Sequence, residues 1–165
     1  MLVAITLIVS FCLDGIVSNF IPIHSQLLIP LLTLMSLLII YPYFNHHEDD
    51  YLKVAGVLGL CYDIVFTDTV FLHCVLFLLV ALFIRLLNEW FSNNIVSIGF
   101  MAVLVIAFDR ILEYSILSLV GFFAFDGMYL LQGIYSSILL NVIYAILLYV
   151  VTDKISRKFH IRKIE

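Results

Sequence analysis

An aspartate, Asp63, lies inside one of the most apolar stretches of the chain, VAGVLGLCYDIVF at residues 54–66. A carboxylate at bilayer depth costs about 2.5–3.5 kcal/mol on an insertion scale, so it usually faces protein and has a function. At helical spacing, Ala55, Gly59 and Asp63 fall four residues apart on one ridge. Ala55 and Gly59 make a small-xxx-small pair that lets another helix come close, and Gly56 lies beside them. The pattern predicts a tight helix–helix contact, either with a partner protein or within the chain's own bundle.

A second group of charges, Asp109, Arg110 and Glu113, lies within a later apolar stretch. Arg110 and Glu113 are three residues apart and can pair on one helix face, whereas Asp109 and Glu113 repel each other unless a base intervenes. Because a planar guanidinium can bridge two carboxylates, we expect Arg110 to be the internal counter-ion, with Glu113 as its local partner and Asp63 as its cross-helix partner. Asn141, in the last apolar stretch, can hydrogen-bond across helices. Together, Asp109, Arg110, Glu113 and Asn141 form the predicted intramembrane polar network.

Asp14 lies near the end of the first apolar stretch, with Ser10 and Ser18 on the same helical face. An interfacial position in contact with water and a position inside the bundle are both open for it. Intramembrane carboxylates can also carry protons or ions, but no broken-helix pair or inverted repeat stands out, which disfavours transport.

Catalytic and metal-binding motifs are absent from the sequence. The run NHHEDD at residues 45–50 has metal-capable side chains, but adjacent ligands on a loop define no geometry, so a solvated turn is the better interpretation. There is no Gly-rich phosphate loop, no nucleophile elbow and no sequence pattern of a Ser–His–Asp catalytic triad. The three cysteines lie in separate apolar runs and form no CxxC pair, which favours packing. We therefore expect no enzymatic activity, no metal, no cofactor and no nucleic-acid partner.

Composition indicates an integral membrane protein. Of 165 residues, 64% are hydrophobic and 12% are charged, and the mean hydropathy is +1.18. Soluble domains are about 45–50% apolar. A spanning helix needs about 20 mostly apolar residues. We expect an all-α bundle of about six transmembrane helices, with five as the competing count, at residues 2–18, 26–43, 51–66, 69–90, 94–121 and 128–151. The fifth is polar in its middle and could be kinked or split. Residues 1–152 would form one bundle, followed by a basic tail at residues 153–165.

The basic residues predict the orientation. Five of the eight lie in the tail, and a cytoplasmic C-terminus with six spans also places Lys53 and Arg85 on the cytoplasmic side. The opposite loops, at residues 19–25, 67–68 and 122–127, contain no Lys or Arg. This distribution fits the positive-inside rule. Both termini are thus expected in the cytoplasm, and the tail could contact anionic membrane lipid.

Two stretches resemble the rod shape-determining MreD family. GLCYDIVF at residues 59–66 resembles that family's G-L-x-Y-D-hydrophobic-x-F element, and LLNVIYAILLY at residues 139–149 is similar to its final span. The resemblance implies a bacterial inner-membrane component of the cell-wall elongation machinery without enzymatic activity. It also implies binding to MreC, a single-span protein, with MreB filaments and wall-synthesising enzymes as further partners. The implied fold is similar to that of the substrate-binding subunits of energy-coupling-factor transporters.

The alternative function is such a vitamin-type binding subunit. Those subunits typically carry an Ala-x-x-x-Ala pattern on their first helix and enclose an outward-facing polar pocket. The first helix here lacks the pattern, and the short outer loops offer little to hold a polar vitamin. A membrane scaffold is therefore the preferred prediction.

Overall fold

The computed structural model describes residues 1–20, 29–44, 48–67, 71–121 and 126–160. Over these residues the chain is all-helical and contains six α-helices. They are α1 (Leu2–Phe20), α2 (Leu32–Ile40), α3 (Glu48–Phe66), α4 (Leu72–Trp90), α5 (Ile95–Leu119) and α6 (Gly127–Lys158). A 3-10 turn, Tyr41–Tyr43, continues α2. The predicted all-α fold with six helices is confirmed.

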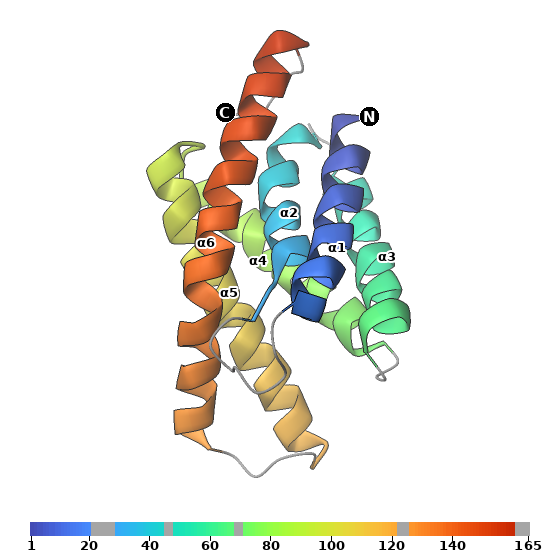
Figure 1. The fold of residues 1–165 in the computed structure, drawn as a ribbon, viewed down its shortest axis with the longest axis vertical. Helices are drawn as coiled ribbons and strands as arrows, with labels where there is room; N and C mark the ends of the chain where they lie inside the picture. The colour runs from blue at the N-terminus through green and yellow to red at the C-terminus, as the bar shows by residue number, and fades with distance from the viewer. Residues whose placement is uncertain (21–28, 45–47, 68–70, 122–125, 161–165) are drawn as a thin grey trace.

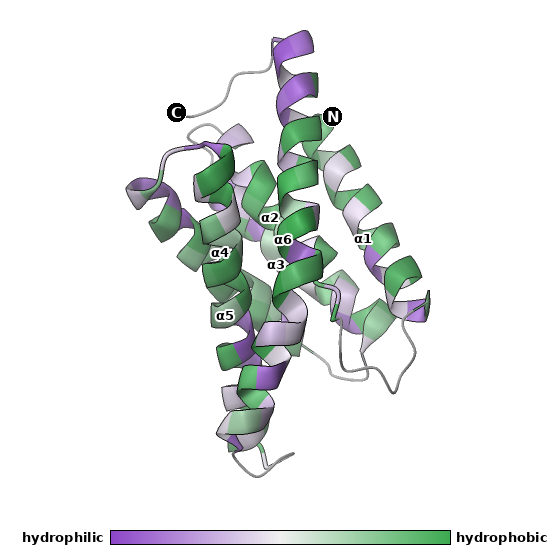
Figure 2. Ribbon diagram, turned by 60° about the vertical axis from the view of Figure 1, so that its left-hand side comes forward, coloured by the Kyte–Doolittle hydropathy of each residue, from purple (hydrophilic) through white to green (hydrophobic). Residues whose placement is uncertain are grey.

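Four helices, α1, α4, α5 and α6, are long and apolar enough to cross a membrane. Apolar residues cover most of α1 and α6, and hydrophilic residues gather in the last turns of α6 (Figure 2). The nine residues of α2 rise roughly 14 Å at 1.5 Å per residue, which is less than half of a hydrocarbon core about 30 Å thick. The second element therefore cannot cross a membrane as a helix alone.

The short helix α2 lies at the centre of the bundle (Figure 1). Every one of its residues is buried, and it contacts α1, α4 and α6. Leu34, Met35 and Leu37 are fully buried, as are Ile84 of α4 and Met101 of α5. A helix that is apolar on all sides is stable only when other helices surround it, and α2 meets this condition.

The other helices pack largely as sequential neighbours. The most extensive contacts join α3 with α4 and α5 with α6. The start of α1 and the end of α6 lie at the same end of the molecule, and the last turns of α6 extend beyond the other helices (Figure 1). The ends of α1, α3 and α5 and the starts of α2, α4 and α6 lie toward the opposite end (Figure 1). We call it the outer end, because the charge distribution predicts that it faces away from the cytoplasm.

Several predicted features of the spans differ from the structure. The second span was expected from residue 26, but α2 begins at Leu32. Leu31 has non-helical dihedrals, and Pro30 disfavours helical geometry at the residue before it. The fifth helix is continuous over 25 residues rather than split. The sixth continues to Lys158, because Ser156 is buried and Arg157 pairs with Asp153 at 2.8 Å.

Parts of several predicted loops lie outside the described residues. These are residues 21–25, 68 and 122–125 of the outer loops, 45–47 of the polar run, and 161–165 of the tail. Residues 26–28 of the expected second span and 69–70 of the expected fourth span also lie outside the described residues.

Candidate functional site

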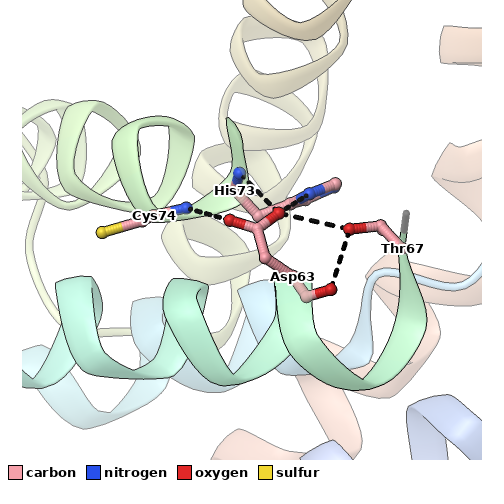
Figure 3. A network of polar contacts seen from close by, with 4 residues as sticks. All are labelled: Asp63, Thr67, His73 and Cys74. Carbon is pink, nitrogen blue, oxygen red and sulfur yellow. Dashed lines mark hydrogen bonds and ion pairs between the residues drawn. The ribbon is translucent and has the colours of Figure 1, made fainter. Parts of the chain in front are cut away.

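Asp63 caps the start of α4 (Figure 3). Its Oδ1 accepts a hydrogen bond from the backbone N–H of His73 at 3.0 Å, and its Oδ2 accepts one from Cys74 at 3.1 Å. The His73 Nδ1 lies 2.8 Å from Oδ1, and the Thr67 hydroxyl donates to the same oxygen at 3.2 Å. The first N–H groups of a helix have no partner within the helix and carry a partial positive charge. A carboxylate from α3 therefore satisfies and neutralises the start of α4 inside an apolar bundle.

Close approach of the two backbones makes this cap possible. A Cβ added to Gly59 would lie 2.4 Å from the His73 carbonyl oxygen and 2.7 Å from the Cys74 Cα. A Cβ on Gly56 would lie 3.4 Å from a methyl group of Leu78, which is ordinary contact. Ala55 is fully buried. The small-residue ridge of α3 thus packs against α4 within the chain.

Asp14 caps the start of α2 in a similar way. Only 1% of this residue is exposed, so it lies inside the bundle rather than at the interface. Its Oδ1 accepts a hydrogen bond from the backbone N–H of Leu32 at 3.2 Å, and its Oδ2 accepts one from Thr33 at 3.0 Å. Both oxygens of the carboxylate are therefore engaged by the first turn of α2, which begins within the bundle.

Asn141 holds the non-helical residues that precede α2. Its Oδ1 accepts from the Leu31 N–H at 2.7 Å, and its Nδ2 donates to the Ile29 carbonyl at 2.8 Å and to the Ser137 carbonyl at 2.6 Å. Non-helical backbone at membrane depth is tolerated only where protein or water satisfies its polar groups. Asn141 and Asp14 supply this satisfaction from α6 and α1, so the bundle can contain a broken second element.

The three charged residues of α5 do not all pair. Arg110 Nη1 donates to Glu113 Oε2 at 2.6 Å, and both side chains are mostly buried. Asp109 is 4% exposed, and among the described residues no hydrogen bond or ion pair engages its carboxylate. Because an unpaired buried charge is costly, Asp109 is an exception within the bundle.

These residues line a cavity of about 280 Å³ at the outer end. The apolar side chains of Leu34, Phe66 and Phe77 form part of its wall. Its polar lining comes from α1, α3, α4, α5 and the residue after α3, and consists of Asp14, Ser18, Tyr62, Thr67, His73, Asp109, Arg110 and Glu113. A second cavity of about 200 Å³ lies between α5 and α6 and shares Ile29, Arg110 and Glu113 with the first.

Comparison with known protein families decides the class of this chain. The family model described as rod shape-determining protein MreD matches residues 1–159 of the sequence. The chain belongs to the MreD family. Searches of curated proteins and of solved structures find no match.

Family membership makes this a membrane protein with a role in rod shape determination. The predicted resemblance is confirmed, and it extends well beyond the two stretches of residues that first indicated it. The expected fold similarity to energy-coupling-factor subunits stays a prediction, because no solved structure matches the chain.

The structure separates the predicted intramembrane polar network of this MreD-family chain into two groups. Asp109, Arg110 and Glu113 meet at the polar cavity, whereas Asn141 acts on the residues before α2. The expected cross-helix partner of Arg110 was Asp63, but Asp63 bonds to the start of α4 and Arg110 bonds to Glu113. The reason is distance along the helix: Glu113 lies one turn away from Arg110 on α5, and the N–H groups of α4 lie directly over Asp63.

Sequence reasoning assigned no role to Thr67, and it left the position of Asp14 open. Two signals could have found them. Thr67 follows Asp63 by four residues, which places its hydroxyl over the carboxylate. Asp14 and Pro30 together indicate a helix that starts late and needs an acceptor from outside itself. Within the described ranges, no group of three or more metal-capable side chains comes together.

Proposed function

We propose that this chain is a non-catalytic membrane scaffold of the cell-wall elongation machinery, and that it controls cell shape by binding an MreC-like single-span protein within the membrane. The family match supports the general role. The observation that supports a partner helix is an apolar groove of about 360 Å³ between α1 and α3.

The groove has the composition of a helix-docking surface. Its lining is formed by Ala4, Leu7, Ile8, Lys53, Val54, Val57, Leu58 and Cys61. Lys53 is the only charged member of this set. Ile8 and Val57 are each 62% exposed, although they lie on adjacent helices. In a membrane, helices associate through close packing rather than through the hydrophobic effect. A groove between two helices offers a partner helix more contact than a single helix surface does.

The predicted partner residues take a different place in this proposal. Ala55, Gly56, Gly59 and Asp63 pack within the bundle, on the side of α3 that faces α4. Val57 and Cys61 lie on the exposed side of the same helix. The ridge would therefore support the partner indirectly, because it fixes the position of α3, while the exposed side of α3 makes the contact.

The proposed location is the bacterial inner membrane, with both termini in the cytoplasm. The basic residues at the end of α6 would then face anionic lipid, and MreB filaments and wall-synthesising enzymes would be reached through the same assembly. Common placement of the start of α1 and the end of α6 supports this orientation (Figure 1).

Site-specific photo-crosslinking in the native membrane tests the proposal. A photoreactive phenylalanine analogue replaces Val57 in the groove or, as the matched control, Leu139 on α6, which is 66% exposed and outside the groove. We expect a crosslink to a single-span protein from position 57 and none from position 139. Adducts with lipid alone at position 57, or equal protein yields at both positions, would contradict groove docking.

The polar cavity favours the second candidate function, a small-molecule-binding subunit of a transporter. The short outer loops predicted no such pocket, yet side chains of five helices line a polar cavity. Co-purification distinguishes the two candidates. An MreC-like protein recovered with the tagged chain supports the scaffold, whereas an ATPase pair with a large membrane subunit supports the transporter.

A further inference from the structure

Asp109 is the one acid lining the outer cavity whose carboxylate accepts no hydrogen bond from a described residue. The two oxygens of Asp14 accept backbone N–H groups of α2, and Glu113 pairs with Arg110. Asp109 lines the same cavity, is 96% buried when its 4% exposure is subtracted, and has no described hydrogen-bond partner. Its neighbour Arg110 donates to Glu113 through Nη1 rather than to Asp109.

The cavity as a whole is negative. Three carboxylates and one guanidinium line it, so its formal charge is minus two with a neutral His73. A low-dielectric wall strengthens the attraction of such a site for a positive charge. The cavity also reaches the surface, because the exposed Ser18 is one of its lining residues.

We propose that this cavity binds a small organic ammonium group, with the Asp109 carboxylate as its anionic contact. The volume of about 280 Å³ is close to the lower end of the range typical of small-ligand sites, about 300–1,000 Å³. Phe66, Phe77 and Tyr62 line the cavity, and the faces of aromatic rings attract an ammonium group. The second cavity between α5 and α6 gives room for a longer substituent.

Two sources of the ammonium group share this chemistry. One is a free amine on the outer side of the membrane, and the other is the headgroup of an ethanolamine-containing lipid. Neither depends on the proposed binding of a partner in the α1–α3 groove, so failure of one proposal leaves the other standing.

Charge-selective thiol labelling measures the field of Asp109 directly. In the full chain with Cys12, Cys61 and Cys74 changed to Ser, Ser18→Cys places a single thiol at the mouth of the cavity. The rates of modification by cationic trimethylammonium-ethyl and anionic sulfonatoethyl methanethiosulfonate are each divided by their rates with a free thiol. Coulomb's law predicts that the cation-to-anion ratio falls about fivefold or more on Asp109→Asn.

Two control variants make the ratio interpretable. Asp109→Glu keeps the charge and should keep the ratio. Asp126→Asn removes an exposed acid that is not part of the cavity and should also leave it unchanged. A ratio is used because a change in accessibility alters both rates alike. An equal ratio for the single-thiol chain with and without Asp109→Asn overturns the proposal.

Protection identifies the occupant. In vesicles of phosphatidylglycerol, added ethanolamine should slow cationic labelling of the chain that retains Asp109 and leave the Asp109→Asn chain unaffected. If the lipid is the source, vesicles containing phosphatidylethanolamine should protect without any added amine. Protection in either arm supports the site. Absence of protection in both arms overturns an ammonium-binding site even if the labelling ratio falls.

Discussion

Replacing Gly59 by alanine should separate α3 from α4 at the Asp63 cap. The new Cβ would lie 2.4 Å from the His73 carbonyl oxygen, whereas ordinary contact begins at 3.4 Å. The start of α4 must therefore move by about 1 Å, the difference of these two values. The atoms in the way belong to the backbone, so a side-chain rotation cannot relieve the clash.

Such a shift would remove the hydrogen bonds of the cap. The two bonds from Asp63 to backbone N–H groups measure 3.0 and 3.1 Å, and about 1 Å more takes both beyond the usual limit of about 3.2 Å. Overpacking costs about 1–3 kcal/mol, and intramembrane hydrogen bonds average about 0.6 kcal/mol each. Alanine regains about 0.8–1 kcal/mol of helix propensity over glycine. The expected net loss of stability is about 2 kcal/mol.

Gly56→Ala is the matched control on the same helix. Its Cβ would lie 3.4 Å from the end of the Leu78 side chain, so this variant should be neutral or more stable by up to about 1 kcal/mol. The assay is a titration of the purified protein from mild detergent into sodium dodecyl sulfate, followed by circular dichroism and by the fluorescence of Trp90. Equal unfolding midpoints for the two variants would refute the close contact at Gly59.

Three further changes test the polar interior by the same titration. Asp63→Asn should lose about 1–2 kcal/mol of stability, because the carboxylate accepts charge-assisted hydrogen bonds. The control Asp50→Asn, at an exposed residue, should change stability by less than about 0.5 kcal/mol. Similar losses for the two variants would show that the cap contributes nothing. Asn141→Leu should cost about 2–4 kcal/mol, since it removes the hydrogen-bond partner of a buried N–H and of a carbonyl before α2. An unfolding midpoint equal to that of the parent would mean that water replaces the amide. Arg110→Glu and Glu113→Arg should each cost about 2 kcal/mol. This is less than the loss on breaking a fully buried ion pair, because both side chains are partly exposed. The double variant should recover most of the loss if the contact matters.

Local composition predicted five of the six described helices well, because α1, α3, α4, α5 and α6 are each at least 19 residues long and largely apolar. Composition could not predict the short α2. The apolar run continues with little interruption from residue 27 to residue 40, so a hydropathy profile predicts one long span. The break depends on Pro30 and on two acceptors from distant parts of the chain, Asp14 and Asn141. Such long-range satisfaction of backbone groups leaves no periodic signal.

The ridge on α3 shows a similar limit. Ala55, Gly59 and Asp63 indicated a tight contact, and the structure contains one. Spacing on a single helix does not say which helix approaches, so the identity of α4 as the neighbour could not be read from it. The ion-pair prediction for Arg110 failed between helices and held within one, because an i,i+3 pair is fixed by helix geometry, whereas a cross-helix pair requires the fold.

The allocation of polar groups has a consequence for recognition. Asp14, Asp63 and Asn141 each bond to backbone groups of a helix start or of the residues before it. They are therefore committed to the bundle, and a partner within the membrane cannot engage them without uncapping a helix. Under the proposed scaffold role, the α1–α3 groove must then select its partner by shape. Enlarging Val57 should impair partner binding more than neutralising a nearby charge such as Lys53, because only the first changes the volume that a helix must fill.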